Sequence, residues 1–306
     1  MPCICYVSKK FGAKSKVVID NTNAIIAEYA AQGFTLTLRQ CYYQHVARGL
    51  LPNAQKEYKR LGDIISDARM AGLIDWEAIV DRTRHVRQNS HWGGPSEIVK
   101  SCAEQFAIDK WAGQPRYCEV YVEKDALIGV IEPVCSALDV PCLSCRGYAS
   151  QSEVWSASQR LLGHVKSGQK VTVFHLSDHD PSGIDMSRDL QERFDTFADW
   201  MGDDKQKRIT VQRIALTMAQ VHQYNPPPNP AKETDSRFTG YRSKFGDKSW
   251  ELDALDPKTL TALINKHVKS VRDTGLWNAK VFIENEHKVE LAKIAAKLAK
   301  KEDSDD

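Results

Sequence analysis

From Arg116 to Leu216 the sequence alternates short β-rich runs with helical runs, and this alternation limits the fold more than any other feature. The β-rich runs span residues 117–122, 140–144, 170–176 and 209–216, and helical runs lie between them at 126–138, 153–165 and 184–197. Strands that alternate with helices predict a parallel sheet covered by helices. We therefore expect an α/β fold for this part of the chain.

The residues before and after this stretch predict mostly helices. Helices are expected over 18–32, 37–49 and 54–71, followed by a strand pair at 73–76 and 79–86, which is the layout of a winged helix. Helices at 257–271 and 278–300 follow a Pro-rich loop at 225–230, and the tail at 300–306 is expected to be disordered. The predicted organisation is a winged-helix (CAP-like) domain at 1–90, a helical connector at 91–115, a sheet domain at 116–220 and a mostly helical C-terminal extension at 221–306.

Composition excludes several classes of protein. The 306 residues carry a formal net charge of +2, which fits neither a highly basic nucleic-acid-coating protein nor an acidic disordered one. No apolar run approaches the roughly 18 residues of a membrane span, and the N-terminus lacks a signal peptide's apolar centre, so we expect a cytoplasmic protein with no membrane partner. The eight cysteines are expected to be reduced, and the CxxC pair, Cys142 and Cys145, lacks the second ligand pair that a zinc site needs.

Acidic residues follow two of the predicted strands. Glu123 ends the run at 117–122, and Asp178 and Asp180 follow the run at 170–176. Ligands of open α/β sheets bind beyond the carboxyl ends of the strands, so these carboxylates are expected to converge. Three such groups facing one point repel one another unless a cation lies between them, and hard oxygen ligands select Mg²⁺ or Mn²⁺. The alternative is that 178–183 is only a turn that caps the next helix, with Asp185 as a partner of that helix's dipole.

A second candidate region is the predicted helix at 37–49. Thr37 and Gln40 have the spacing of a capping box, and helical geometry places Arg39 and Tyr43 on one edge. Tyr42 is expected in the core, whereas Tyr43 is expected to present its hydroxyl outward. A tyrosine needs a cationic neighbour or a metal ion to attack at neutral pH, and Arg39 is such a neighbour. The alternative is that Tyr43 is an interface aromatic without chemistry.

Basic residues follow in the next helix and in the predicted wing. Lys56, Lys59, Arg60 and Arg84 are the candidates for contacts with DNA phosphates, alongside Arg69, Arg82 and Arg87. The alternative for each is a solvated helix face.

Together these motifs resemble the A subunit of topoisomerase VI and its relative, the meiotic double-strand-break transesterase. The tyrosine motif looks like LRQCYY at 38–43, the Toprim glutamate like Glu123 in YVEKDAL, and the family's DxD like Asp178 and Asp180 in SDHDPSGID. The stretch at 225–255 looks more like that of bacterial and phage-borne relatives. Its Glu251 and Asp253 are predicted to be structural, and the alternative is that they support the metal ligands from behind. The resemblance implies a winged-helix domain joined to a Toprim domain, with Tyr43 as nucleophile and Arg39 beside it.

The resemblance also implies an activity. Tyr43 would attack a phosphate of duplex DNA, leaving a 5′-phosphotyrosyl link and a free 3′ hydroxyl, with Mg²⁺ (or Mn²⁺) held by Glu123, Asp178 and Asp180. The family works as a homodimer in which the tyrosine of one subunit meets the metal site of the other. As a type IIB topoisomerase A-subunit-like protein at the nucleoid, the chain would need a separate ATP-hydrolysing B-type subunit for strand passage, because it contains no P-loop.

Two other functions agree with the same residues. A Toprim nuclease would hydrolyse DNA with a metal-activated water and leave Tyr43 as a packing residue. A non-catalytic DNA-binding protein would use the acidic residues only for structure.

Overall fold

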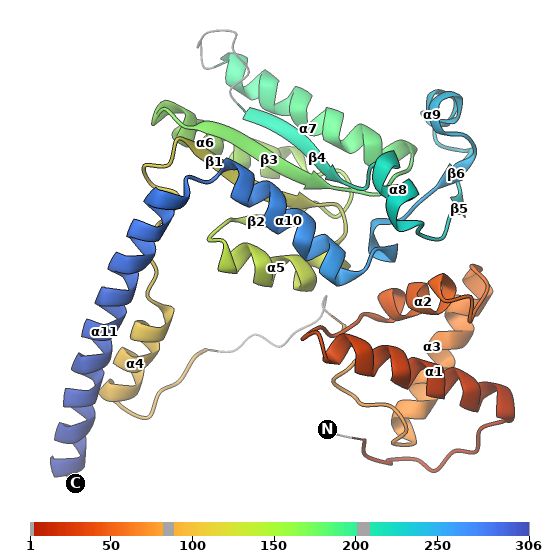
Figure 1. Cartoon of the computed structure of the whole chain (residues 1–306), viewed down its shortest axis with the longest axis horizontal. Helices are drawn as coiled ribbons and strands as arrows, with labels where there is room; N and C mark the ends of the chain where they lie inside the picture. Colours follow the sequence, from red (N-terminus) through yellow and green to blue (C-terminus); the bar gives the residue numbers. More distant parts are fainter. Residues whose placement is uncertain (1–2, 82–88, 201–208, 306) are drawn as a thin grey trace.

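The computed structural model describes residues 3–81, 89–200 and 209–305, and its centre is a parallel sheet between helices (Figure 1). The sheet has four strands in the order β2-β1-β3-β4, and every neighbouring pair is parallel. The strands are β1 (Arg116–Val122), β2 (Cys142–Ser144), β3 (Lys170–Leu176) and β4 (Ile209–Ala215). The predicted α/β fold is therefore confirmed.

Helices cover both faces of this sheet. Figure 1 shows α6 (Gln151–Lys166) and α7 (Pro181–Trp200) on one face and α5 (Ile128–Ala137) and α10 (Pro257–Val271) on the other. Val120 and Phe174 are fully buried at the centre of this core. A strand covered on both faces needs apolar side chains in both directions, which explains the continuous β-rich runs in the sequence.

The first three helices enclose a second hydrophobic core. They are α1 (Ala13–Ala30), α2 (Leu38–Ala47) and α3 (Gln55–Met70), packed around buried residues such as Ile25 and Leu61. The predicted capping box is present at the start of α2. The predicted strand pair after α3 is not seen in residues 73–81, where Ile79 makes a single parallel bridge to Leu36 and the others lie in turns, bends or irregular backbone. The Arg69 guanidinium donates hydrogen bonds to the carbonyls of Trp76 and Ile79, which a hairpin would use for strand pairing. Residues 82–88 lie outside the described residues.

Two helices run away from the sheet as a pair. Figure 1 shows α4 (Pro95–Gln105) alongside α11 (Thr274–Asp305), which ends at the C-terminus. The predicted disordered tail is instead helical up to Asp305. Its last turns are held because Glu302 accepts a hydrogen bond of 3.1 Å from the backbone N–H of Ser96, at the start of α4.

Residues 228–256, which we call the connecting segment, lie between the two cores. Ala254 packs in the N-terminal core, whereas Leu252 and Leu255 belong to the core around the sheet. The short elements of this segment are β5 (Asn229–Pro230), α9 (Phe238–Phe245), β6 (Lys248–Ser249) and η2 (Leu252–Ala254), and two further short helices, η1 (Asp125–Leu127) and α8 (Met218–Tyr224), lie outside it. Among the described residues, no helix is long and apolar enough to cross a membrane.

Candidate active site

Glu123 and Asp178 lie at the carboxyl ends of neighbouring strands. Glu123 directly follows β1, Asp178 comes two residues after β3, and the last residues of the two strands, Val122 and Leu176, are paired. The chain leaves β1 toward β2 on one side, whereas β3 continues to β4 on the other, so the strand order reverses between them. Ligands of open α/β sheets bind at this reversal, beyond the carboxyl ends. The topology therefore favours a site at these two carboxylates.

A pocket of about 510 Å³ opens at this edge of the sheet. Its walls come from the N-terminal helices, from the loops after β1 and β3, and from the connecting segment. All five residues predicted to carry the chemistry line it, namely Arg39, Tyr43, Glu123, Asp178 and Asp180. Tertiary structure thus brings the tyrosine helix and the acidic strand ends to one pocket.

The Lys124 ammonium is the centre of the charge network in this pocket. Its Nζ lies 3.0 Å from Asp178 Oδ2, 2.8 Å from Glu251 Oε2 and 2.9 Å from Asp253 Oδ1. Burial by itself lowers the pKa of Lys124, but Asp253, Asp178 and Glu251 outweigh this effect and raise it well above its ordinary value. Lys124 therefore stays protonated and neutralises part of the acidic cluster.

Arg39 reaches the same cluster from helix α2. Its Nη2 lies 3.0 Å from Glu251 Oε2, and its Nε lies 3.3 Å from Asp253 Oδ2. Burial raises the pKa of Glu251, but the positive charges of Lys124 and Arg39 more than offset this and lower it to about 2. Glu251 and Asp253 of the connecting segment are thus each paired with two cations. Arg39 comes from helix α2, and Lys124 follows strand β1.

The negative charges of Asp178 and Glu123 are less completely balanced by nearby positive charges. Burial raises the pKa of Asp178 to about 7, with Glu123 and Asp253 acting in the same direction and Lys124 against it. Burial also raises the pKa of Glu123, although its Oε2 accepts the backbone N–H of Asp178 at 2.9 Å, which favours the charged form. The end of the sheet therefore carries more acidic groups than its cations balance.

Tyr43 is buried rather than directed outward as predicted. Only 3% of its surface is exposed, although it lines the pocket. Burial raises the pKa of its hydroxyl, as do the charges of Glu251 and Asp253, while Asn229 and Arg39 act in the opposite direction. The prediction of an exposed hydroxyl was wrong because helical geometry does not include the connecting segment that covers α2.

Tyr42 is in the core as predicted, and it has a structural role. Its hydroxyl accepts the backbone N–H of Ala54 at 2.7 Å and lies 3.1 Å from the carbonyls of Pro52 and Ala54. These contacts hold the chain just before α3. The hydroxyl of Tyr42 is therefore used in hydrogen bonds with the backbone, whereas Tyr43 faces the charged groups of the pocket.

The loop after β3 is both a turn and a wall of the pocket. The carboxylate of Asp180 accepts hydrogen bonds from the backbone N–H of Gly183 at 2.6 Å and from Ser182 Oγ at 3.0 Å, so it caps helix α7. A Cβ at Gly183 would lie 2.3 Å from the carbonyl oxygen of Asp178. Residues 178–183 were interpreted either as an acidic ligand site or as a turn that caps the next helix. The two interpretations are compatible, because the tight turn presents Asp178 and Asp180 to the pocket.

The connecting segment is paired with this loop. His179 and Trp250 exchange backbone hydrogen bonds of 2.8 and 3.0 Å, and Asp178 Oδ1 accepts the N–H of Leu252 at 2.7 Å. Arg213 of β4 supports the loop from the other side, donating to the carbonyl of Asp178 at 2.5 Å. This pairing brings Glu251 and Asp253 into the pocket region.

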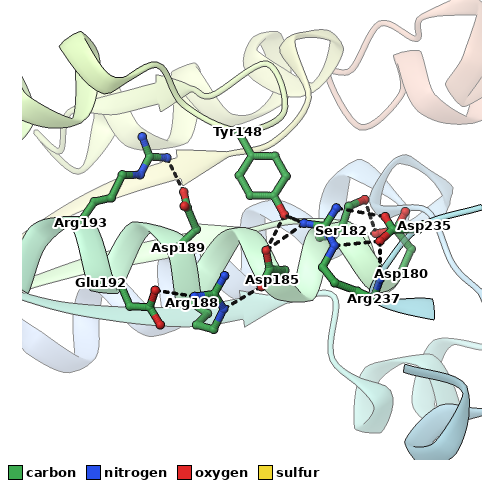
Figure 2. A network of polar contacts seen from close by, with 11 residues as sticks. Tyr148, Asp180, Ser182, Asp185, Arg188, Asp189, Glu192, Arg193, Asp235 and Arg237 are labelled. Carbon is green, nitrogen blue, oxygen red and sulfur yellow. Dashed lines mark hydrogen bonds and ion pairs between the residues drawn. The ribbon is translucent and has the colours of Figure 1, made fainter. Parts of the chain in front are cut away.

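Asp185 belongs to a separate ionic network on α7 (Figure 2). Its carboxylate accepts hydrogen bonds from Arg188 at 2.7 Å, from Arg237 at 2.9 Å and from the Tyr148 hydroxyl at 2.6 Å. The bond from Arg188 is the main reason that the pKa of Asp185 falls to about 2. Asp185 therefore ties α7 to the connecting segment and does not line the pocket with the other acids.

The basic residues predicted to contact DNA have different surroundings. Lys56 and Lys59 are exposed on α3, whose residues Gln55 and Tyr58 line the pocket. Arg60 is paired with Glu57, with 2.7 Å between Nε and Oε2. Arg84, together with Arg82 and Arg87, lies outside the described residues.

The predicted metal ligands fit Mg²⁺ or Mn²⁺ in chemistry but not in their present arrangement. Carboxylate oxygens suit these ions. In the part of the chain that the structure describes, however, no three Asp, Glu, His or Cys side chains are grouped as a metal site requires. Asp178 is held by Lys124, Asp180 by the start of α7 and Glu123 by a backbone N–H. Metal binding would therefore require these side chains to exchange partners.

The sequence did not single out Lys124 or Arg213, and for Glu251 and Asp253 it favoured a structural role over one in support of the acidic site. The position of Lys124 directly after Glu123 is a signal that was available, because a cation beside a predicted acidic site is bound to affect it. No sequence signal places Glu251 and Asp253 at the pocket, because their location depends on the backbone pairing of Trp250 with His179.

Comparisons with family models, with curated proteins and with solved structures find no match to this chain.

Proposed function

We propose that this protein is a DNA-cleaving transesterase, similar to the A subunit of a type IIB topoisomerase. The observation that carries the proposal is that Tyr43 and Arg39 line the same pocket as Glu123, Asp178 and Asp180. On this proposal the helical unit of α1 to α3 is a winged-helix domain and the sheet domain is a Toprim domain. The reversal of strand order at the acidic edge supports the second assignment, because that edge is the place for a ligand.

The proposed reaction exchanges one phosphoester for another. Tyr43 Oη forms a bond to the phosphorus of a backbone phosphate, and the bond from phosphorus to the 3′ oxygen breaks. The tyrosine proton is released, the 3′ oxygen gains a proton, and a 5′-phosphotyrosyl link remains. No oxidant or nucleotide is consumed, which agrees with the absence of a P-loop from the sequence.

The positive charges of the pocket have a defined part in this reaction. Burial disfavours the phenolate of Tyr43, so attack requires positive charge at the reacting phosphate. Arg39 and Lys124 supply that charge, although each is now paired with Glu251 and Asp253. The substrate phosphate would replace these carboxylates. Bound Mg²⁺ or Mn²⁺, held by Glu123, Asp178 and Asp180, would supply further neutralisation of the phosphate.

The proposed partners follow from the same chemistry. Double-stranded DNA is the substrate, approached through the exposed Lys56 and Lys59 on α3, with Arg60 and Arg84 as further contacts. A homodimer would cut both strands, and a separate ATPase subunit of the B type would be needed for strand passage. These partners place the protein in the cytoplasm, at the nucleoid.

The test uses end-labelled duplex DNA with Mg²⁺ or Mn²⁺, quenched with denaturant. Wild-type protein is expected to give a DNA band linked to protein, and Tyr43→Phe is expected to give none. Tyr224→Phe is the matched control, because Tyr224 is exposed and outside the pocket, and it should match wild type. A covalent band that persists in Tyr43→Phe would refute the assignment of the nucleophile.

Hydrolysis by a Toprim nuclease is the second candidate, and the burial of Tyr43 favours it. A buried hydroxyl with a raised pKa is a poor nucleophile, whereas the carboxylates can act on a water molecule without it. The same assay separates the two reactions. Metal-dependent cutting without a covalent band, equal in wild type and Tyr43→Phe, would establish hydrolysis.

A further inference from the structure

We infer that the helix pair α4 and α11 is a dimerisation arm, which joins two copies of this chain through one apolar side of the pair. Figure 1 shows the two helices leading away from the sheet domain, with α11 ending at the C-terminus. The inference gives a surface to the homodimer of the proposed function. It uses no residue of the pocket and does not depend on the proposed reaction.

The two helices of the arm run antiparallel. At the start of α4 the backbone N–H of Ser96 donates to Glu302, near the end of α11, at 3.1 Å. Just after α4 the backbone N–H of Ile108 donates to Glu284 Oε2, in the first half of α11, at 3.1 Å. The early residues of α4 therefore lie beside the late residues of α11.

One side of α11 packs on α4 and on the loop after it. Residues on this side recur at alternating intervals of four and three, which is the heptad spacing of packed helices. They are buried or half-buried, and they are Val281, Glu284, Lys288, Leu291, Ala295 and Leu298. Val99 and Ala103 form the matching side of α4. These two seams make the contact within the arm, so apolar residues outside them need another explanation.

Four such residues, which we call the isoleucine face, lie outside the seams and are exposed. On α11, Ile283 exposes 41% of its surface and Ile294 exposes 44%. On α4, Ile98 exposes 39%, and Cys102 is exposed as well. Ile283 and Ile294 are about three turns apart, so they lie on one line along α11. Ile98 and Cys102 are four residues apart and share one line along α4.

Both lines of the isoleucine face lie on the same side of the arm. At about 100° per residue, each line is rotated by about 100° from the seam of its own helix, and in the same sense. Because the helices are antiparallel, this shared sense brings the two lines to one side of the pair. On the other side α4 presents Glu97, Lys100 and Glu104. Only one side of the arm therefore carries apolar residues from both helices.

The angle between seam and face indicates what covers the face. In a four-helix bundle each helix packs against two neighbours, in directions about 90° apart. Each helix of the arm has one neighbour at its seam and an apolar line about 100° away, which is the pattern of half a bundle. A two-fold interface pairs one patch with the same patch of the partner. A second copy of the arm therefore supplies the missing half.

The size of the face suits a dimer. The helices run side by side from the level of Glu284 to that of Glu302, about 28 Å of helix, and two helices are about 20 Å wide. Covering this face on both copies would bury about 1,100 Å² in total, and a specific protein interface needs about 1,000 Å² or more.

The charge of the arm favours a second copy over a nucleic acid. Helix α4 carries one Lys and two Glu, and α11 carries six Lys and six Asp or Glu. Binding to DNA phosphates needs an excess of positive charge, which the arm lacks. Two copies of a nearly neutral arm meet no net repulsion.

The test is sedimentation equilibrium of the full chain without DNA. Wild type is expected to form a dimer of twice the 34.5 kDa chain mass. The double variant Ile283→Asp/Ile294→Asp should raise the dimer Kd about 100-fold or more, because the dimer would bury unpaired carboxylates. Val289→Asp is the matched control, since Val289 exposes 55% of its surface on α11 but lies off the isoleucine face. Circular dichroism checks that both variants keep their helices.

Each other result overturns the inference. Wild type that is monomeric up to about 100 μM has no interface of this kind. A dimer that survives the double isoleucine variant is held by another surface. Equal loss of the dimer in Val289→Asp would move the interface to the other edge of α11.

The reactivity of Cys102 provides a second measurement on the same face. In a Cys3→Ser/Cys5→Ser background, Cys102 is the remaining exposed cysteine of the described residues. Its labelling by a maleimide should be about tenfold slower in this dimer than in the same protein with both isoleucines replaced by Asp, because the interface covers the thiol. Equal labelling rates would contradict the inference.

Both measurements are made without DNA, so they separate the arm from the reaction. A wild type that dimerises through the isoleucine face but forms no covalent product removes the proposed reaction and leaves the arm. A wild type that forms the covalent product while the double isoleucine variant stays dimeric removes the arm and leaves the reaction.

Discussion

The two halves of the candidate site are held in place by different kinds of structure. Glu123 and Asp178 follow strands whose ends are aligned by the hydrogen bonds of a parallel ladder. Arg39 and Tyr43 belong to a helix of a separate core, and their position depends on the connecting segment and its ion pairs. A ladder aligns strand ends through many backbone bonds, whereas the helix is placed by a few side-chain contacts. The acidic half should therefore resist perturbation more than the tyrosine half, unless the charge that joins them is removed.

The largest effect is expected from Lys124→Met, which removes the charge shared by both halves. Asp178, Glu251 and Asp253 would then be buried without their common cation, at a cost of about 3–5 kcal/mol in the free energy of unfolding. Urea denaturation measures this loss. The control, Lys56→Met on the exposed face of α3, should change stability by no more than about 0.5 kcal/mol. Equal effects of the two variants would show that the acidic cluster does not depend on Lys124.

The second-largest effect is expected in the dependence of stability on pH, which should differ between the two halves of the site. The pKa of Asp178 is raised to about 7 in the folded protein, above its unfolded value of about 3.9. Its protonation stabilises the fold fully below the unfolded pKa, and this contribution is lost as pH rises toward 7. The pKa of Glu251 is lowered to about 2, so its contribution is present above about 4.3 and is lost as pH falls toward 2.

Thermal unfolding across pH 2–8 in the presence of a chelator tests both slopes. Asp178→Asn should flatten the decline between about pH 4 and 7 and leave the acid limb unchanged. Glu251→Gln should do the reverse. If the two variants flatten the same limb, the two carboxylates are not charged as their surroundings indicate.

A smaller loss is expected from Gly183→Ala, which tests how tightly the acidic half is built. The added Cβ would lie 2.3 Å from the carbonyl of Asp178, so the turn must shift, at a cost of about 1–3 kcal/mol. Gly163→Ala is the matched control, because its Cβ meets nothing within 4 Å inside helix α6. There alanine should stabilise the protein by up to about 1 kcal/mol. Opposite signs in urea denaturation are the expected result, and a neutral Gly183→Ala would contradict the tight turn.

The smallest effect is expected from Tyr29→Phe, which loosens the tyrosine half alone. The variant removes the hydrogen bond from Tyr29 to Asp256 and should cost about 1 kcal/mol. Limited proteolysis should show faster cleavage of the connecting segment than in Tyr224→Phe, whose hydroxyl is on an exposed residue. Unchanged proteolysis would mean that this bond does not hold the N-terminal unit.

Local patterns predicted the secondary structure well and the environment of single side chains less well. The run at 170–176 matches β3, and the helix at 257–271 matches α10, because strand and helix periodicities are short-range signals. Residues 73–81 of the predicted strand pair after α3 do not form a hairpin, and Arg69 donates hydrogen bonds to the carbonyls of Trp76 and Ile79 there. Tyr43 was expected to face outward, but residues about 200 positions later in the sequence cover it. Contacts over that separation leave no periodic trace near residue 43.

By itself the sequence determined the parallel sheet with its acidic strand ends, the capping box of α2 and the turn at Gly183. Each of these depends on interactions between residues close in the chain or on the rule that parallel strands end at one edge. Only the tertiary structure decided that Lys124 joins three carboxylates, that Glu251 and Asp253 hold Arg39, and that Tyr43 is buried beside them. Those contacts join residues from two hydrophobic cores, and their energies arise only once both cores have folded and water has been excluded between them.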